Sequence, residues 1–160
     1  VQTCALPILF YKRRDYTQIV NGRNPIVAHE FLGSSVEGKD VIIIDDMISS
    51  GDSIIEVATE LKRRKAKRIF AAATFGLFTN GLDKFDQAYE DGTISGILTT
   101  NLIYQTPELL SRPYYINCDM SKYIALIIDT LNHDGSISSI LSPDERIQHV
   151  LQKYKNGETI

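Results

Sequence analysis

The sequence predicts an α/β fold, a parallel twisted sheet with helices on both faces. Short apolar runs alternate along the chain with segments whose apolar residues recur at helical spacing. The run at 41–45 is apolar without alternation, which is typical of a strand buried on both sides. Ligands of such sheets bind at the carboxyl ends of the strands. A functional site is therefore expected where these apolar runs end.

The first part of the chain is expected to hold a strand end, a long loop and a buried strand. Residues 9–11 end a strand, and most of 12–38 forms a loop, within which 25–33 can form a strand leading to a turn. The strand at 41–45 precedes a helix at 53–65, where Ser53 and Glu56 match an S-x-x-E capping box.

The rest of the chain continues the alternation. Apolar runs predict strands at 68–75, 94–99 and 114–118. Helices are predicted at 82–89, 106–110, 120–132 and 143–154; the third is expected to be largely buried, and the last has a proline in its first turn. The aromatic residues Phe75, Phe78 and Phe85 are expected to pack in the core or between subunits rather than to hold an adenine ring.

Composition limits the classes of function. A chain of 160 residues, 43% hydrophobic and 23% charged, suits a soluble globular domain. Its net charge is −3 and its basic residues cluster only at 12–14 and 62–68, so no nucleic-acid partner is expected. No apolar run has the length of a membrane span. Cys4 and Cys118 have neither metal nor disulfide spacing, which favours a cytoplasmic protein.

The first eight residues differ from the rest. The segment VQTCALPI lacks the charged region of a signal peptide, and we expect residues 1–8 to be a non-native leader, with a natural strand or linker as the alternative. Residues 9–160 are expected to form one domain without an internal boundary.

The segment VIIIDDMISSGDS at 41–53 carries the candidate site. Asp45 and Asp46 follow the apolar run, and carboxylates there can accept hydrogen bonds from ribose hydroxyls. The loop from Ser49 to Ser53 offers hydroxyl donors, and its backbone near Gly51 can approach an anion closely. A helix N-terminus, which favours negative charge, follows. The pattern indicates a sugar-phosphate site; turn or helix-capping residues are the alternative.

Together with KRR at 12–14, this loop resembles that of the ribose-phosphate pyrophosphokinases, also called phosphoribosyl pyrophosphate synthetases. The similarity extends from about residue 9 to 154 and includes TFGLFTNGL at 74–82, TTN at 99–101 and SISSIL at 136–141. The DD loop alone would indicate only the wider type I phosphoribosyltransferase fold. The resemblance implies the C-terminal domain of a longer synthetase whose N-terminal half is missing, so the 160-residue chain is not expected to be active alone.

The resemblance also implies a reaction: ribose 5-phosphate and ATP give phosphoribosyl pyrophosphate and AMP, for nucleotide biosynthesis. Mg²⁺ is the implied cofactor, with its ligands mainly in the missing half and no metal ligand among the site residues. A homo-oligomer, a hexamer in full-length relatives, is implied. Lys12 and Arg14 match a flexible catalytic loop, whose cations would stabilise the transferred phosphates. The implied ribose 5-phosphate-binding residues are Asp45, Asp46, Ser49, Ser50, Gly51, Asp52 and Ser53.

Two positions depart from the family loop, which is closer to DTGGT. Ser49 replaces an aspartate and Asp52 replaces a glycine. An acid at 52 would repel phosphate if it pointed inward, so Asp52 is expected to point outward or to cap the helix. Thr99, Thr100 and Asn101 end a strand at the same sheet edge, and a role for them in lining the site stays open. The alternative functions are a nucleobase phosphoribosyltransferase and a non-catalytic regulatory homologue that binds a sugar phosphate or nucleotide.

Overall fold

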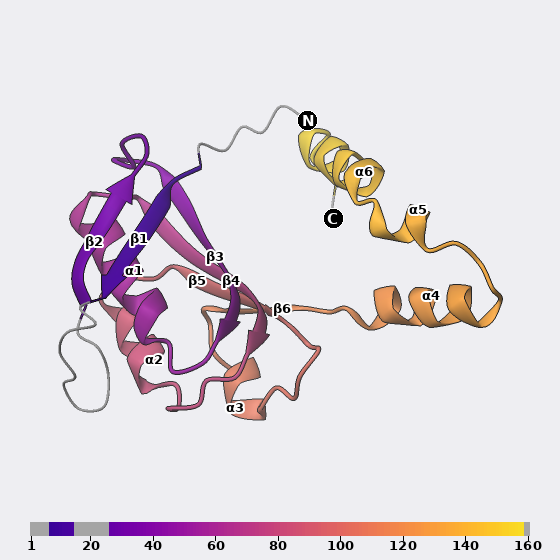
Figure 1. Ribbon diagram of the computed structural model, residues 1–160, viewed down its shortest axis with the longest axis horizontal. Coiled ribbons are helices and arrows are strands. Elements are labelled where there is room, and N and C mark those ends of the chain that lie inside the picture. Colours follow the sequence, from indigo (N-terminus) through magenta and orange to yellow (C-terminus); the bar gives the residue numbers. More distant parts are fainter. Residues whose placement is uncertain (1–6, 15–25, 159–160) are drawn as a thin grey trace. The chain divides into compact units, whose positions relative to one another are not determined.

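The computed structural model describes the backbone of residues 7–14 and 26–158, and the side chains of 7–8, 32–138, 140–144 and 146–158 (Figure 1). The chain divides into two compact units, with the boundary in the sequence between Asn117 and Cys118, and each unit is described by itself. Most of the predicted leader, residues 1–6, lies outside the described residues.

The first unit begins with a β-hairpin. Strand β1 (Leu9–Arg14) pairs antiparallel with β2 (Ile26–Leu32), with Lys12 opposite His29 and Arg14 opposite Ile26. The strand predicted within 25–33 is confirmed, but the prediction of a loop at 12–14 is wrong. A strand partner distant in sequence decides the conformation of a polar segment more than the segment's own composition does.

The central sheet of this unit has four parallel strands, and the predicted α/β class is confirmed. In order across the sheet they are β3 (Asp40–Ile48), β4 (Arg68–Gly76), β5 (Gly96–Thr100) and β6 (Tyr115–Cys118). The helices that connect them are α1 (Asp52–Arg63), α2 (Asp83–Glu90) and α3 (Pro107–Leu110). Each strand therefore pairs with its neighbour in sequence, through a helical crossover (Figure 1).

The hydrophobic core lies on one face of this sheet. Crossovers between parallel strands are nearly always right-handed, so a sheet that grows in one direction places its connecting helices on one face. Alternate strand residues face α1 and α2 there and form one buried cluster with them. Its strand members include Val41, Ile69, Ala71 and Ile97, and its helical members are Ile54, Ala58, Leu61, Phe85 and Ala88.

The opposite face of β3 is exposed. The side chains of Ile42 and Ile44 are 62% and 83% exposed, whereas Val41 is 9% exposed. The prediction that the strand at 41–45 is buried on both sides is therefore wrong for these two isoleucines. The consecutive strand order explains the difference, because α1 and α2 both pack on the other face.

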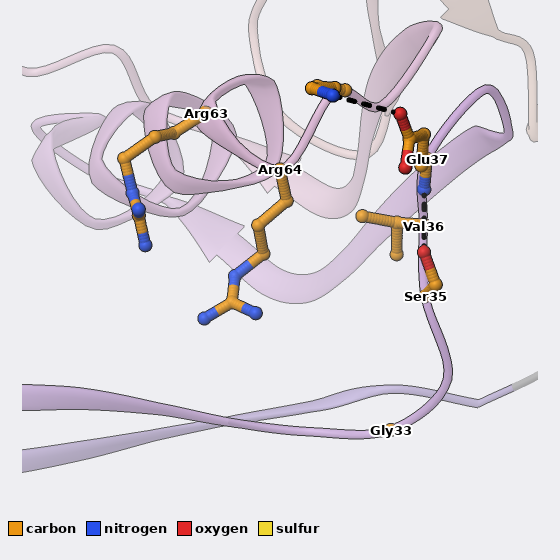
Figure 2. Close-up of a pocket in the computed structure, with 7 residues that line it drawn as sticks. Gly33, Ser35, Val36, Glu37, Arg63 and Arg64 are labelled. Carbon is orange, nitrogen blue, oxygen red and sulfur yellow. Dashed lines mark hydrogen bonds and ion pairs between the residues drawn. The ribbon is translucent and has the colours of Figure 1, made fainter.

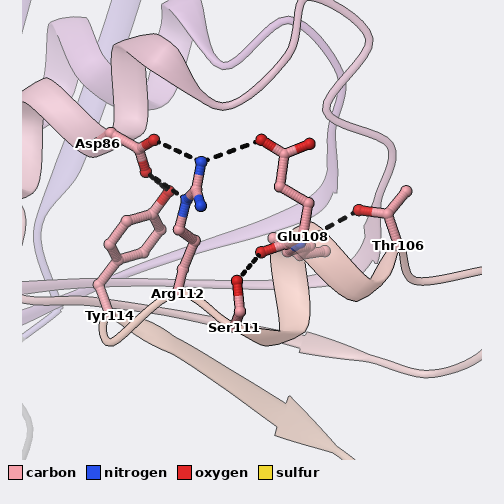
Figure 3. Close-up of polar contacts among 7 residues, drawn as sticks. Asp86, Thr106, Glu108, Ser111, Arg112 and Tyr114 are labelled. Carbon is pink, nitrogen blue, oxygen red and sulfur yellow. Dashed lines mark hydrogen bonds and ion pairs between the residues drawn. The ribbon is translucent and has the colours of Figure 1, made fainter.

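A charged cluster joins α2 to the segment between α3 and β6 (Figure 3). Tyr114 donates its hydroxyl to Asp86 at 2.6 Å, and Arg112 donates Nε to the same oxygen at 2.9 Å. Arg112 also contacts Glu108 at 3.0 Å. Burial would raise the pKa of Asp86, but the hydrogen bonds from Tyr114 and Arg112 outweigh it and hold the pKa below its ordinary value. Burial, reinforced by Asp86, raises the pKa of Tyr114.

The second unit contains α4 (Ser121–Asn132), α5 (Ser138–Leu141) and α6 (Asp144–Lys155). The helices predicted at 120–132 and 143–154 are confirmed, whereas α5 was not predicted. Tyr123 of α4 donates its hydroxyl to the carbonyl of Ile140 at 2.7 Å, and the Arg146 guanidinium lies 5.5 Å from the centre of the Tyr123 ring.

The prediction that the helix at 120–132 is largely buried is wrong. No residue of α4 is buried, and Ile128 is 62% exposed. The second unit is too small to bury such a helix on its own apolar surface. Among the described residues, none of the helices is both long and apolar enough to pass through a membrane.

Asp86→Asn is expected to make stability less sensitive to acid. A carboxyl group whose pKa is lower in the folded chain contributes stability above its unfolded pKa, near 3.8, and loses it as the pH falls through the folded value. Asparagine keeps an acceptor for Tyr114 but has no charge to lose. Urea unfolding at about pH 6.5 should show a loss of about 1–2 kcal/mol, and that loss should shrink at about pH 3.

The control for this experiment is Asp83→Asn, an exposed residue in the first turn of the same helix. A loss of stability in Asp86→Asn that is equal at both pH values would contradict the role of the Asp86 charge.

Candidate functional site

Asp45 and Asp46 lie within β3 rather than after it. The strand runs to Ile48, three residues beyond the predicted end, and Asp45 is in register with Ala73 of β4. Asp45 accepts the backbone N–H of Asp46 at 2.9 Å, and Asp46 accepts that of Met47 at 2.8 Å. Both aspartates are exposed. Because neighbouring strand residues point to opposite faces, the two carboxylates do not converge on one point.

The loop after β3 turns sharply into α1 at Gly51. This residue is the N-cap, buried, with φ of 81°, in the left-handed region that favours glycine. The first helical hydrogen bond runs from the N–H of Ile55 to the carbonyl of Gly51 at 3.0 Å. The predicted capping box is wrong, because the helix begins at Asp52 and Ser53 already lies in its first turn.

The ring of Phe85 lies directly beneath Gly51. A Cβ atom at position 51 would be 2.1 Å from Cζ of Phe85, which is closer than real side chains approach. Phe85 is 1% exposed and packs edge-to-face on Phe78, with 5.1 Å between ring centres. The predicted packing role is confirmed for Phe78 and Phe85, whereas Phe75 is 37% exposed. The loop therefore rests on a fixed aromatic support.

The segment after β4 holds the same loop from the side. The N–H of Leu77 donates to the carbonyl of Ile48 at 2.8 Å, and the N–H of Thr79 donates to the carbonyl of Ser49 at 3.1 Å. Between them, Phe78 has φ of 46°, an uncommon value for a residue with a side chain. These bonds fix the backbone that leads into the Ser49–Ser50–Gly51 turn.

Asp52, one of the two departures from the family loop, has specific partners. Its carboxylate accepts the hydroxyl of Ser50 at 2.9 Å and forms an ion pair with Lys84 of α2. Its backbone opens the first turn of α1. The structure thus brings Ser49, Ser50, Gly51, Asp52 and Ser53 together in one turn. The side chains of Lys12 and Arg14 lie outside the described residues, and only their backbone is placed, in β1.

Sequence analysis missed a polar cluster at the carboxyl ends of β5 and β6. Gln105 donates to the Tyr115 hydroxyl at 2.5 Å, to the Thr100 carbonyl at 3.2 Å and to Asn117 Oδ1 at 3.1 Å. Thr99 is 1% exposed, and its hydroxyl contacts that of Tyr115 at 2.6 Å. Thr99 therefore belongs to the core, and it does not line a surface site. Gln105 follows no recognisable pattern, so only its place after a strand end could have drawn attention to it.

A second candidate for anion binding lies at the other end of α1 (Figure 2). This pocket, of about 410 Å³, is lined by Gly33, Ser35, Val36, Glu37, Arg63, Arg64 and Lys65. Its cations already have acidic partners, because Arg63 and Arg64 both contact Glu60 at 2.7 Å and Lys65 contacts Glu37 at 3.1 Å.

The pKa of the Glu60 carboxyl is consistent with its contacts to Arg63 and Arg64. The Arg63 hydrogen bond, opposed by burial and reinforced by Arg64, lowers the pKa of Glu60 to about 2. A helix C-terminus also repels anions. The N-terminal end of α1 is therefore the better anion site.

No metal cage is present in the described part of the chain. Among the side chains that the structure describes, no three His, Cys, Asp or Glu residues are placed to hold a metal ion together. These residues do not fit a Mg²⁺ ion held by protein side chains alone.

Residues 18–142 match the family described as the phosphoribosyl synthetase-associated domain. The chain belongs to this family. Its resemblance to the C-terminal part of the ribose-phosphate pyrophosphokinases, predicted from KRR and the DD loop, is confirmed.

Two curated relatives give the extent of the match. The chain is 31% identical over 112 residues to a ribose-phosphate pyrophosphokinase of Vibrio parahaemolyticus, covering 69% of this chain and 34% of the relative. A Shewanella oneidensis ribose-phosphate pyrophosphokinase is 32% identical over 107 residues, covering 67% and 33%. The chain thus spans about a third of the length of the curated relatives it matches.

A solved structure supports the fold. The phosphoribosylpyrophosphate synthetase from Mycobacterium smegmatis superposes with a TM-score of 0.58 at 24% identity, covering 68% of this chain and 35% of that one. At this identity the likeness shows the fold alone, and it confirms the α/β class with a parallel sheet.

Gly51→Ala is expected to destabilise the chain by about 2–4 kcal/mol, because a methyl group adds left-handed strain to a clash with Phe85. Gly38→Ala is the matched control: its φ is 69°, but a Cβ there would meet nothing within 4 Å. It should lose only the strain component, about 1 kcal/mol. Chemical unfolding of both variants measures the difference, and equal losses would mean that the Phe85 contact is not rigid.

Proposed function

We propose that this domain supplies the sugar-phosphate site of a ribose-phosphate diphosphokinase, which converts ribose 5-phosphate and ATP to phosphoribosyl pyrophosphate and AMP. The observation that carries the proposal is the rigid turn at Ser49–Gly51, which leads into the N-terminus of α1. Membership of the phosphoribosyl synthetase-associated family supports the same assignment.

The 5-phosphate would bind at the start of α1. The first N–H groups of a helix lack carbonyl partners within it, and the helix dipole adds positive potential at this end. Gly51 allows the left-handed turn that sets the start of the helix, and the hydroxyls of Ser49 and Ser53 would supply further donors, whereas the hydroxyl of Ser50 already donates to Asp52. The backbone N–H, rather than the carboxylate, is the part of Asp52 suited to contact the anion.

The ribose hydroxyls would contact the exposed carboxylates of β3. An aspartate has two oxygens with several lone pairs, so a single backbone hydrogen bond to Asp45 leaves capacity for sugar hydroxyls. Asp45 is the first choice. Asp46 projects to the other face of the strand, so it would contact the sugar only from a different side.

In the chemical step, the ribose O1 attacks the β-phosphorus of ATP. A new O–P bond forms, the bond between the β-phosphorus and the α,β-bridging oxygen breaks, AMP leaves, and the O1 proton is released. The transferred diphosphate is highly charged, so cations that close over it stabilise the transition state. Lys12 and Arg14 are proposed for this role, from the hairpin β1–β2.

The ATP site and the Mg²⁺ ligands are proposed to lie in the part of the longer enzyme that this chain does not match. The relatives are about three times as long as the matched region. Mg²⁺ would neutralise charge on the phosphates of ATP. The active form is proposed to be a cytoplasmic homo-oligomer of the longer enzyme, and the 160-residue chain is proposed to bind ribose 5-phosphate without turning it over.

Asp45→Ala is expected to weaken the binding of ribose 5-phosphate about tenfold, the effect of losing hydrogen bonds to a charged acceptor. Isothermal titration of the chain measures the Kd. The control is Asp40→Ala at the other end of the same strand, where the carboxylate pairs with Arg68. An unaltered Kd in Asp45→Ala would remove Asp45 from the sugar site.

Lys12→Ala is expected to lower turnover about a hundredfold or more in a protein that contains this chain and makes phosphoribosyl pyrophosphate. The melting temperature should change little, because the side chain would act on charge that develops during transfer. The rate of AMP formation is the measurement, with Lys39→Ala, an exposed residue before β3, as the control. Full activity of Lys12→Ala would exclude it from catalysis.

A further inference from the structure

The proposed phosphate site contains an electrostatic conflict. Asp52 is the first residue of α1, beside the Gly51 turn where the phosphate would bind. A carboxylate at a helix N-terminus is favourable to the helix, but it occupies the same positive potential that would attract a phosphate. Unless its charge is compensated, Asp52 would repel the ligand.

Lys84 provides the compensation. Its ammonium forms an ion pair with Oδ1 of Asp52, while the hydroxyl of Ser50 donates to Oδ2 at 2.9 Å. Both carboxylate oxygens are thus held by partners on either side. The next residue of α2 is Phe85, whose ring supports Gly51. Lys84 and Phe85, which are consecutive in α2, therefore contact Asp52 and Gly51, which are consecutive at the start of α1.

The position of Lys84 is not explained by the stability of α2. It is the second residue of that helix, where a cation opposes the helix dipole and an acid is preferred. The ion pair is also partly exposed, with side-chain exposures of 51% for Lys84 and 35% for Asp52. Exposed pairs add little to folding stability. The main physical effect of Lys84 is consequently on the charge of the loop.

We propose that Lys84 is a positioning residue for sugar-phosphate binding, which neutralises Asp52 and holds its carboxylate so that the turn at Gly51 can accept a phosphate. This inference rests on the proposed function of the loop. It accounts for the presence of an acid where the related enzymes are expected to have a glycine.

The test is a double-mutant cycle on the 160-residue chain, with ribose 5-phosphate as the titrated ligand in isothermal calorimetry. Lys84→Met should raise the Kd about tenfold, because it leaves the Asp52 charge uncompensated beside the phosphate. Asp52→Asn should lower the Kd. The double variant should regain at least the affinity of the unmodified chain, since it has neither charge.

Lys67→Met is the matched control. It removes the same charge from an exposed lysine, which lies between α1 and β4. It should leave the Kd unaltered, which separates a local effect from one of net charge. Melting temperatures of Lys84→Met and the unmodified chain should be close, as expected for an exposed ion pair.

The outcomes separate this inference from the function on which it rests. If the unmodified chain binds ribose 5-phosphate and Lys84→Met binds equally well, the inference is overturned and the proposed function stands. Weak binding by Lys84→Met that Asp52→Asn does not restore would also overturn it, because Lys84 would then contact the ligand itself. No binding by the unmodified chain would overturn the proposed function and the inference together.

Discussion

The contact between the Phe85 ring and the backbone of Gly51 is the constraint on which the site depends. The ring fills the space that any side chain at 51 would occupy, so the turn can be made only by glycine in a left-handed conformation. This contact fixes where α1 begins and ties it to α2. Phe78, packed on the same ring, extends the support to the segment after β4, which in turn holds the carbonyls of Ile48 and Ser49.

The pairing of charged side chains differs between the two ends of α1, and this difference decides which end better suits an anion. At its C-terminal end, several cations surround a pocket, but Glu60 and Glu37 engage them, and the helix dipole disfavours anions there. At its N-terminal end the only acid of the turn, Asp52, is itself paired. The end with fewer cations is therefore the better candidate for binding an anion, because backbone N–H groups and the dipole act there and Lys84 offsets the charge of Asp52.

Much of this architecture could be predicted from local sequence patterns. Strands β3 to β6, and the helices between them, follow from hydrophobic spacing, and the loop at 49–53 follows from its small residues before a helix. The predictions failed where distant contacts decide the outcome. The KRR segment is a strand because 26–32 pairs with it. The exposure of Ile44 depends on strand order, which an apolar run does not reveal. The capping box failed because Gly51, supported by Phe85, is the N-cap and the helix begins at Asp52, whose ion-pair partner lies thirty-two residues away.

The consecutive order of the strands has a consequence for how the first unit folds. Each strand from β4 to β6 pairs with the strand immediately before it in the sequence, so every new pairing closes only one short crossover. Because no pairing waits for a strand that is made later, a chain emerging from the ribosome can add its strands in the order of synthesis. The Phe85 contact with Gly51 becomes possible as soon as α2 is made, before β5 and β6 exist. The turn at Gly51 can thus take its final shape while the rest of the sheet is still being synthesised.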